Sequence, residues 1–195
     1  DYLVKWEGGG KLIVRSIRYA SERKRTERHL QYLAQFDPLT GVGNRQYFTD
    51  QIFKAAARAR RAGSQLALLF LDLDHFKTVN DAMGHDVGDR LLKRVARRLQ
   101  DCIRLGDFIA RIGGDEFAIL IENVDDLDVL RSLATKLLAQ IAEPFELEGR
   151  PYFATGSIGI TIFPQDGNDP ALLLKNADIA MYAAKARGRN QFCFI

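Results

Sequence analysis

Two adjacent carboxylates beside two glycines are the residues of this sequence best suited to chemistry. Gly113 and Gly114 stand between two apolar runs, and Asp115 and Glu116 follow them directly. A glycine pair between β-forming runs is typical of a hairpin turn. Glycine tolerates positive φ and has no Cβ that would keep a bound group away from the backbone. The four residues could therefore form a solvated acidic hairpin tip or the reactive turn of an active site, and only the surrounding sequence distinguishes the two.

A second pair of acids follows a continuous apolar run. Residues 66–71 are all apolar, as expected for a strand buried on both faces, and Asp72 and Asp74 come shortly after them. These two acids could simply cap a loop. If Asp72 instead meets Asp115 at one edge of a sheet, the pair forms a hard oxygen site of the kind that Mg²⁺ prefers. Polymerase-like palms use such a pair, with two metal ions, for in-line displacement at phosphorus.

Composition and charge exclude several classes of protein. The chain has 195 residues, 47% of them hydrophobic, enough for one domain with a core and a short appendage. It has no apolar run long enough for a membrane span and no signal-peptide pattern, so we expect a cytoplasmic location without direct membrane contact, although the parent protein could be anchored. The net charge of +3 does not indicate a nucleic-acid partner. Cys102 and Cys193 are expected to be reduced, packed thiols.

The first 36 residues indicate an appendage to the main domain. Residues 2–7 and 12–19 have the pattern of two strands around three glycines, and a lone hairpin is marginally stable in water. We expect residues 1–20 to be the end of an upstream domain, or a strand pair that docks on another part of the protein. Residues 21–36 combine a charged run with a thin apolar stripe, which predicts a linker helix. That helix could be a solvated connector or half of a two-stranded coiled coil.

Residues 37–195 alternate between strand and helix patterns, after a turn-forming sequence that separates them from the linker. From residue 66 the expected order is strand, helix, strand, strand, helix, strand. This is the ferredoxin-like split βαβ order of an α+β fold, here with extra helices and a hairpin. In such a sheet the first strand runs beside the hairpin, so Asp72 can approach the glycine turn. The expected helices cover about 44–62, 86–103, 127–141 and 169–184, and the expected strands cover 66–71, both arms of the glycine hairpin, 145–148, 152–163 and 191–195.

Seven short motifs carry a resemblance to a known family. They are Asp37-Pro-Leu-Thr-Gly41, Asn44-Arg45, Asp72-Leu-Asp-His-Phe-Lys77, Asn80-Asp81, Gly84-His-Asp-Val-Gly-Asp89, Gly113-Gly-Asp-Glu-Phe117 and Lys185-Ala-Arg-Gly-Arg-Asn190. In this order they resemble the GGDEF family of diguanylate cyclases, over roughly residues 37–195. Residues 1–20 resemble the tail of a PAS sensor domain, and residues 21–36 resemble its linker helix. The resemblance implies a core like that of polymerase palms and nucleotide cyclases.

The resemblance also implies roles for the acids. Asp72 and Asp115 match the family's metal-binding acids, with the Leu73 carbonyl as a further ligand. The implied cofactor is Mg²⁺ or Mn²⁺, with two ions per active site. Glu116 matches the acid held near the ribose 3′-hydroxyl, where it could act as a general base. The glycine pair would allow the backbone to approach the nucleotide phosphates.

Five further residues match the family's nucleotide contacts. Asn80 and Asp89 match the pair that reads guanine. A carboxylate accepts hydrogen bonds from guanine N1–H and its 2-amino group, which adenine does not offer, so Asp89 should select GTP over ATP. An ordinary acid at a helix N-terminus is the alternative for Asp89. The family's cations that hold the triphosphate match Lys77, Lys185 and Arg189, and we group Lys77 with the catalytic residues. Alternatively, these side chains only form a solvated basic helix end.

Arg104 and Asp107 match the RxxD inhibitory site of the family. An arginine can stack on a guanine while the aspartate accepts hydrogen bonds from its edge. A surface ion pair is the alternative. The implied function is condensation of two GTP to cyclic di-GMP and two pyrophosphates by a homodimer, with feedback inhibition by cyclic di-GMP. The main alternative is a catalytically silent receptor for GTP or cyclic di-GMP, and an ATP-using cyclase is disfavoured by Asp89.

Overall fold

The apolar run that begins at Leu66 forms the middle strand of the central sheet. The computed structural model describes residues 17–25, 30 and 32–195. In chain order the strands are β1 (Leu66–Leu73), β2 (Phe108–Gly113), β3 (Glu116–Glu122), β4 (Phe145–Leu147), β5 (Arg150–Tyr152), β6 (Gly156–Phe163) and β7 (Phe192–Phe194). The five-stranded sheet has the order β2-β3-β1-β6-β7. β1 lies antiparallel between β3 and β6, and β7 runs parallel to β6.

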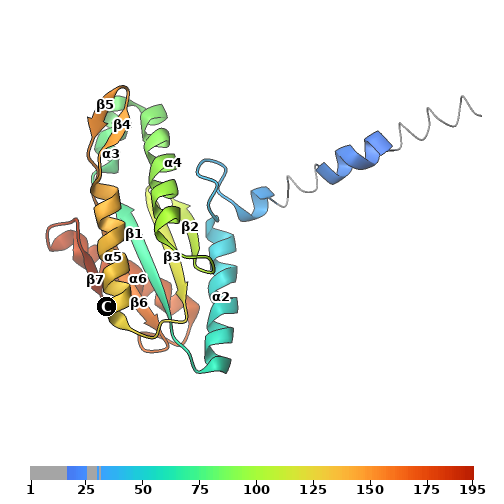
Figure 1. Ribbon diagram of the computed structural model, residues 1–195, viewed down its shortest axis with the longest axis vertical. Helices are drawn as coiled ribbons and strands as arrows, with labels where there is room; N and C mark the ends of the chain where they lie inside the picture. The colour runs from blue at the N-terminus through green and yellow to red at the C-terminus, as the bar shows by residue number, and fades with distance from the viewer. Residues whose placement is uncertain (1–16, 26–29, 31) are drawn as a thin grey trace, which may run out of the picture. The chain divides into compact units, whose positions relative to one another are not determined.

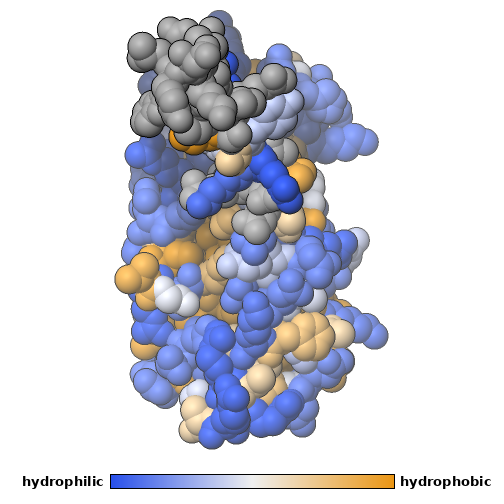
Figure 2. All heavy atoms as spheres, turned by 90° about the vertical axis from the view of Figure 1, so that its right-hand side faces the viewer, coloured by the Kyte–Doolittle hydropathy of each residue, from blue (hydrophilic) through white to orange (hydrophobic). Residues whose placement is uncertain are grey.

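Helices cover both faces of this sheet, which is why β1 is buried along its whole length. The helices are α2 (Arg45–Ala62), α3 (Phe76–Met83), α4 (His85–Cys102), α5 (Leu127–Ala142) and α6 (Pro170–Ala186). Figure 1 shows α4 and α5 in front of the sheet and α6 behind it. Alternate residues of β1 enter two different apolar clusters: Leu69 packs with α4 and α5, while Leu68 and Phe70 pack with α2 and α6. The surface over α2 is mostly hydrophilic (Figure 2).

The order of elements from β1 to β6 confirms the predicted α+β fold with a split βαβ core. Two local signals set the bounds of α2. The Asn44 side chain accepts a hydrogen bond from the Tyr47 amide and so caps the start of the helix. Gly63 ends the helix with a left-handed φ of 66°. Within the described residues, no helix is long and apolar enough to cross a bilayer.

The strand predicted at 145–148 is confirmed as β4, but its expected pairing with a single strand at 152–163 was wrong. The predicted strand 152–163 is two strands, because β5 ends at Tyr152 and β6 begins at Gly156. β4 pairs with β5 in a separate two-stranded sheet rather than with the long strand. Glu148 and Gly149 between them both have positive φ, as a two-residue hairpin turn requires, and this turn closes β4 onto β5. A further difference is α3, a helix that the sequence analysis did not predict.

The chain divides into two units, Asp1–Gln35 and Phe36–Ile195. In the first unit, residues 17–25 are helical, so the predicted strand 12–19 is wrong for residues 17–19. A helix satisfies its backbone hydrogen bonds locally, whereas a strand at this position would need a partner strand. This helix crosses residue 20, where the sequence analysis placed the end of the PAS-like remnant. The other predicted strand, at residues 2–7, lies outside the described residues.

Candidate active site

The glycine hairpin forms as predicted, with its turn displaced by one residue. Gly113 pairs with Glu116, so Gly114 and Asp115 are the two turn residues. Gly114 has a φ of 51°, which favours glycine. A Cβ added at either glycine would meet nothing within 4 Å, so the hairpin leaves open space beside its backbone. The Leu73 amide donates to the Asp115 carbonyl at 3.3 Å and thereby ties the turn to the end of β1.

Three carboxylates meet where β1 ends. Asp72 lies directly opposite Glu116 in the antiparallel register of β1 and β3, and directly opposed residues point to the same face of a sheet. Asp115 precedes Glu116 in the turn, so the structure brings Asp72 and Asp115 to one edge of the sheet. Lys185, in the last turn of α6, places its ammonium 2.7 Å from Oδ1 of Asp72.

Positive charge compensates the carboxylate cluster only in part. Burial raises the pKa of Asp72, and the neighbouring Asp115 raises it further, although Lys185 opposes both effects. Burial also raises the pKa of Asp115. The pKa of Glu116 is raised by burial and then by the charges of Asp72, Asp178 and Asp115. A site with this excess of buried negative charge favours a bound cation.

The donor set suits a hard divalent cation that is bound together with phosphate. The described residues contain no group of three or more His, Cys, Asp or Glu side chains arranged to hold a metal by themselves. Two carboxylates, Asp72 and Asp115, and the backbone carbonyl of Leu73 are the available oxygen ligands. Mg²⁺ is commonly bound by one or two carboxylates, with water and substrate phosphate completing its shell. The residues present therefore fit Mg²⁺ or Mn²⁺ if a nucleotide supplies the remaining ligands.

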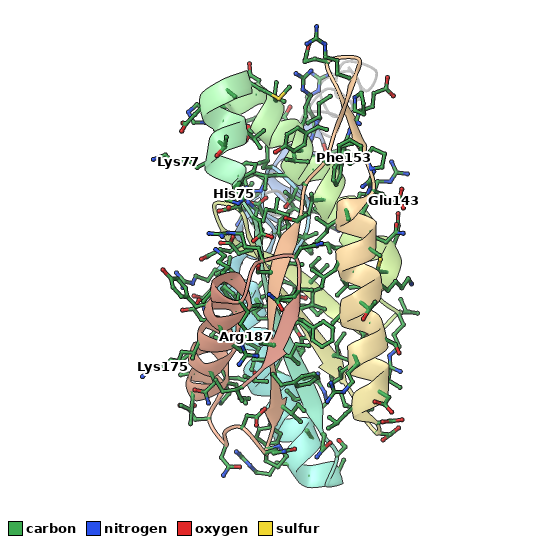
Figure 3. All side chains as sticks on the ribbon, turned by 90° about the vertical axis from the view of Figure 1, so that its left-hand side faces the viewer. His75, Lys77, Glu143, Phe153, Lys175 and Arg187 are labelled. Carbon is green, nitrogen blue, oxygen red and sulfur yellow. The ribbon has the colours of Figure 1, made fainter. Side chains whose placement is uncertain are left out.

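The other two predicted phosphate-binding cations are exposed. Lys77 lies in the first turn of α3 and extends outward from it (Figure 3). Arg189 lies in the loop after α6, where its φ of 64° is left-handed. Within the described part of the chain, neither side chain forms an ion pair with Asp72, Asp115 or any other acid. Both remain free to meet a ligand.

The close packing of α3 and α4 brings Gly88, the residue before Asp89, against Asn80. A Cβ at Gly88 would lie 1.9 Å from Oδ1 of Asn80, so only glycine allows this approach. That Oδ1 atom is buried and has no hydrogen-bond partner among the described residues. Such an unpaired buried acceptor is rare and costs stability unless a ligand donates to it. Asp89, the next residue along α4, is exposed.

Arg104 and Asp107 contact each other in the turn between α4 and β2. Nε of Arg104 lies 3.4 Å from Oδ1 of Asp107, and its Nη2 donates to the Glu122 carbonyl at 2.6 Å. The Asp107 side chain is only 4% exposed and the Arg104 side chain 61%. Both residues line two pockets, of about 220 and 360 Å³. The pair is thus an ion pair in this structure, with space for a ligand on either side.

The sequence analysis missed the contacts that hold the glycine turn from the other side. Nε of Arg111 donates to the Gly114 carbonyl at 2.8 Å, and its Nη1 lies 3.3 Å from both carboxylate oxygens of Asp37. Thr40 donates to the same carboxylate from its backbone amide and its hydroxyl, at 2.8 and 2.6 Å. The Asp37 motif therefore anchors the glycine turn. The signal in the sequence that could have predicted these contacts is an arginine in a strand, two residues before a glycine turn.

Replacing Asp37 with asparagine should lower stability in a pH-dependent way. Burial alone would raise the pKa of Asp37, but hydrogen bonds from Thr40 and the charge of Arg111 outweigh it and hold the pKa below its ordinary value of 3.8. The ionised group thus stabilises the fold above that value, and its contribution is lost as the pH falls through the lowered pKa. We expect Asp37→Asn to cost about 1–2 kcal/mol of unfolding free energy at neutral pH.

Denaturant unfolding of both proteins between pH 2.5 and 7 measures this difference. The gap between them should stay constant down to about pH 4 and shrink below it. Asp50→Asn is the matched control, because Asp50 is an exposed acid of α2 whose contact with Gln46 is a weak one at 3.3 Å. A gap that persists unchanged at the lowest pH would show that the charge of Asp37 is not what stabilises the turn.

The family model described as "Diguanylate cyclase, GGDEF domain" matches residues 34–191. The chain is 43% identical over 184 residues to the bifunctional diguanylate cyclase/cyclic di-GMP phosphodiesterase MucR of Pseudomonas aeruginosa, covering 94% of this chain and 27% of MucR. It is 41% identical over 165 residues to the cyclic di-GMP phosphodiesterase NbdA of the same organism, covering 85% of this chain and 21% of NbdA. The chain therefore spans only a minor part of the length of these relatives.

A solved structure agrees with the sequence comparison. The coiled coil and GGDEF domain of DgcB from Caulobacter crescentus, in complex with cyclic di-GMP, superposes with a TM-score of 0.80 and 28% identity, covering 94% of this chain and 99% of that one. The family match extends over the glycine hairpin, the carboxylate cluster and the α3–α4 contact. On these grounds the chain belongs to the GGDEF family of diguanylate cyclase domains.

Proposed function

We propose that this chain condenses two molecules of GTP to cyclic di-GMP and releases two pyrophosphates. The observation that carries the proposal is the convergence of Asp72, Asp115 and Glu116 at one edge of the sheet, beside the Lys185 ammonium. Relatives named as diguanylate cyclases support it. In each half-reaction a ribose 3′-oxygen forms a bond to the α-phosphorus of the other nucleotide, and the bond to pyrophosphate breaks.

Each side chain of the site has its own role in this reaction. Asp72, Asp115 and the Leu73 carbonyl would hold Mg²⁺ or Mn²⁺, which when bound supplies electrostatic stabilisation of phosphoryl charge. Glu116 accepts the proton of the 3′-hydroxyl, and its raised pKa makes it a stronger base than an ordinary glutamate. Lys185 compensates negative charge at the cluster before and after the pyrophosphate leaves.

Substrate recognition follows from the remaining residues. Lys77 and Arg189 bind the triphosphate, and the open space beside Gly114 lets the phosphates approach backbone amides. The Asn80 amide and the Asp89 carboxylate bind the guanine base. Guanine N1–H and its 2-amino group donate hydrogen bonds to the buried Asn80 oxygen or to Asp89.

Turnover requires a homodimer, because one chain offers one nucleotide site and the product contains two nucleotides. Two protomers must face each other so that each 3′-hydroxyl reaches the other α-phosphorus. The linker segment at residues 21–36, which the sequence predicts as a helix, would then regulate activity by setting the orientation of the two protomers.

A silent receptor is the second candidate, and the name of NbdA supports it. That relative is named for phosphodiesterase activity alone, although it is 41% identical to this chain over 165 residues. Incubation with GTP and Mg²⁺ at high protein concentration distinguishes the two. Release of pyrophosphate supports the cyclase, whereas GTP binding without pyrophosphate supports the receptor. ATP should not replace GTP, because adenine lacks the donors that Asp89 accepts.

Replacing Arg104 with alanine should relieve feedback inhibition. In the proposed inhibitory site the guanidinium binds a guanine of cyclic di-GMP, and Arg104 lies away from the carboxylate cluster. Because the Asp107 side chain is only 4% exposed, the loss of its contact with Arg104 should cost about 1–3 kcal/mol of stability, which thermal unfolding of the variant measures. We expect product inhibition that is noncompetitive with GTP in the parent, and little inhibition with an unchanged initial rate in the variant.

Initial rates across a series of added cyclic di-GMP concentrations test this expectation. Arg97→Ala is the matched control, because it removes the same charge from the exposed side of α4 and should leave inhibition intact. If Arg104→Ala remained as sensitive to cyclic di-GMP as the parent, Arg104 would be only a surface ion-pair residue.

A further inference from the structure

The second acid of the Asp72 and Asp74 pair has a different environment from the first. Asp74 is 6% exposed, and its carboxylate accepts three hydrogen bonds from the protein itself. Oδ1 accepts from the Ser157 hydroxyl at 2.8 Å. Oδ2 accepts from the Thr155 hydroxyl at 2.8 Å and from the Asn190 backbone amide at 3.1 Å. Asp74 is therefore not available as a ligand for a metal or a substrate.

Through these bonds Asp74 joins segments that are far apart in the sequence. Ser157 lies at the start of β6 and Thr155 directly precedes that strand, beside the end of β1, where the Asp74 amide also donates to the Thr155 carbonyl at 2.9 Å. Asn190 lies 116 positions further along the chain, in the loop that follows α6. The carboxylate is thus the point at which the end of β1, the start of β6 and this loop are fixed to one another.

The loop that Asp74 holds has an unfavourable backbone conformation. Arg189 and Asn190 have φ values of 64° and 48°, both in the left-handed region, and neither is glycine. Consecutive left-handed residues of this kind persist only where surrounding bonds hold them. On one side the Arg189 amide donates to the Ala184 carbonyl at 3.2 Å. On the other side the Asn190 amide donates to Asp74, and a charged acceptor makes this the stronger kind of bond.

The same loop contains one cation of the proposed phosphate site and directly follows another. Lys185 is in the last turn of α6, with its ammonium 2.7 Å from Asp72, and Arg189 follows within the loop. We infer that Asp74 is a positioning residue that fixes the 187–190 loop so that Arg189 is held ready for the triphosphate of GTP. This inference rests on the proposed function for the identity of the ligand, but the loop contact itself does not depend on it.

A merely structural role for Asp74 predicts a different set of effects, and Asp166 provides the control. Asp166 is also a carboxylate that accepts a backbone amide, from Ile162 at 2.7 Å, and it lies near the other end of β6. Asp166→Asn should therefore lower the melting temperature, as Asp74→Asn should, without changing how the protein binds GTP. Both substitutions keep the size of the side chain and remove its charge.

Hydrogen exchange of the free proteins tests the loop contact without any nucleotide. In Asp74→Asn the amides of residues 187–191 should exchange at least about tenfold faster than in the parent, because opening of the loop becomes easier. In Asp166→Asn they should exchange at the parental rate. Unchanged exchange of this loop in Asp74→Asn would overturn the inference whatever the protein does with GTP.

GTP affinity in the presence of Mg²⁺ then tests the consequence for the ligand. Asp74→Asn should weaken GTP binding by about 10- to 100-fold, a range typical when a supporting residue of a site is lost or a binding group is displaced. Where the protein turns over GTP, KM should rise more than kcat falls, since Asp72, Asp115 and Glu116 are unchanged. If Asp74→Asn folds poorly, Thr155→Val removes one of the three donors and should show the same pattern with a smaller effect.

A double-mutant cycle with Arg189→Ala decides whether Asp74 acts through Arg189. In the Arg189→Ala background, Asp74→Asn should have almost no further effect on GTP affinity, because the group it positions is already absent. Additive losses would overturn the inference. A parent protein that does not bind GTP would instead refute the proposed function, and the exchange experiment would still report on the loop.

Discussion

Replacing Asp115 with alanine should abolish GTP turnover and leave the fold intact. Asp115 is a turn residue that supplies one of the two carboxylates of the proposed metal site, so its loss removes charge stabilisation at the reacting phosphorus. We expect the rate to fall by at least roughly 10²- to 10³-fold, which is the usual cost of losing one group that stabilises a transition state. Stability should not fall, because burial makes the ionised Asp115 unfavourable in the folded protein.

Pyrophosphate release at saturating GTP and Mg²⁺, together with thermal unfolding in the absence of metal, measures both parts of this prediction. Asp50→Ala is a suitable control, because it removes the same charge from an exposed position on α2. A variant at Asp115 that kept turnover within a few-fold of the parent would remove this residue from the active site. A variant that lost activity only because it unfolded would leave the two-acid assignment without support.

Replacing Asp89 with alanine should weaken GTP binding and reduce the preference of the protein for GTP over ATP. Asp89 is exposed in the free protein, beside the Gly88 contact that brings α4 onto Asn80. When guanine binds, its N1–H and 2-amino groups lose water, and without the carboxylate they are left unpaired. We expect a loss of about 1–3 kcal/mol, the usual cost of unsatisfied donors in a binding site.

Titrations of GTP and ATP against the same protein separate recognition from structure. Asp89→Ala should lose affinity for GTP and leave the weak binding of ATP unchanged. Asp86→Ala is the matched control, since Asp86 is another exposed acid in the first turn of α4 and should affect neither nucleotide selectively. Equal losses for GTP and ATP would mean that Asp89 supports the helix end and does not read the base.

The sequence predicted the long elements of this fold because their signals are local. The apolar run of β1, the Asn44 cap and the Gly63 end of α2 each act within a few residues. α3 was missed because it is only 8 residues long, and His75 at its N-cap makes no side-chain capping bond and has a left-handed φ of 59°. The short strand β5 was not predicted as a separate element, because the turn before it places Glu148, which is not glycine, at positive φ.

In the active site, too, some contacts could be predicted from the sequence and others could not. The approach of Asp72 to Asp115 could be expected, because the order of strands in a split βαβ sheet places the first strand beside the hairpin. The roles of Arg111 and Asp74 could not be read from their neighbours, since Arg111 meets Asp37 across 74 positions and Asp74 meets Asn190 across 116. Such contacts form between segments that only the folded chain brings together, and sequence spacing alone does not predict them.

Product formation from GTP, followed over a wide range of protein concentration, tests the central claim most directly. With Mg²⁺ present and the nucleotide products identified by mass, we expect two pyrophosphates for every cyclic di-GMP. The rate per protomer should rise with protein concentration until the homodimer saturates, because each active site needs two facing chains. GTP that binds but yields no pyrophosphate at any protein concentration would contradict the proposed function and identify the chain as a receptor.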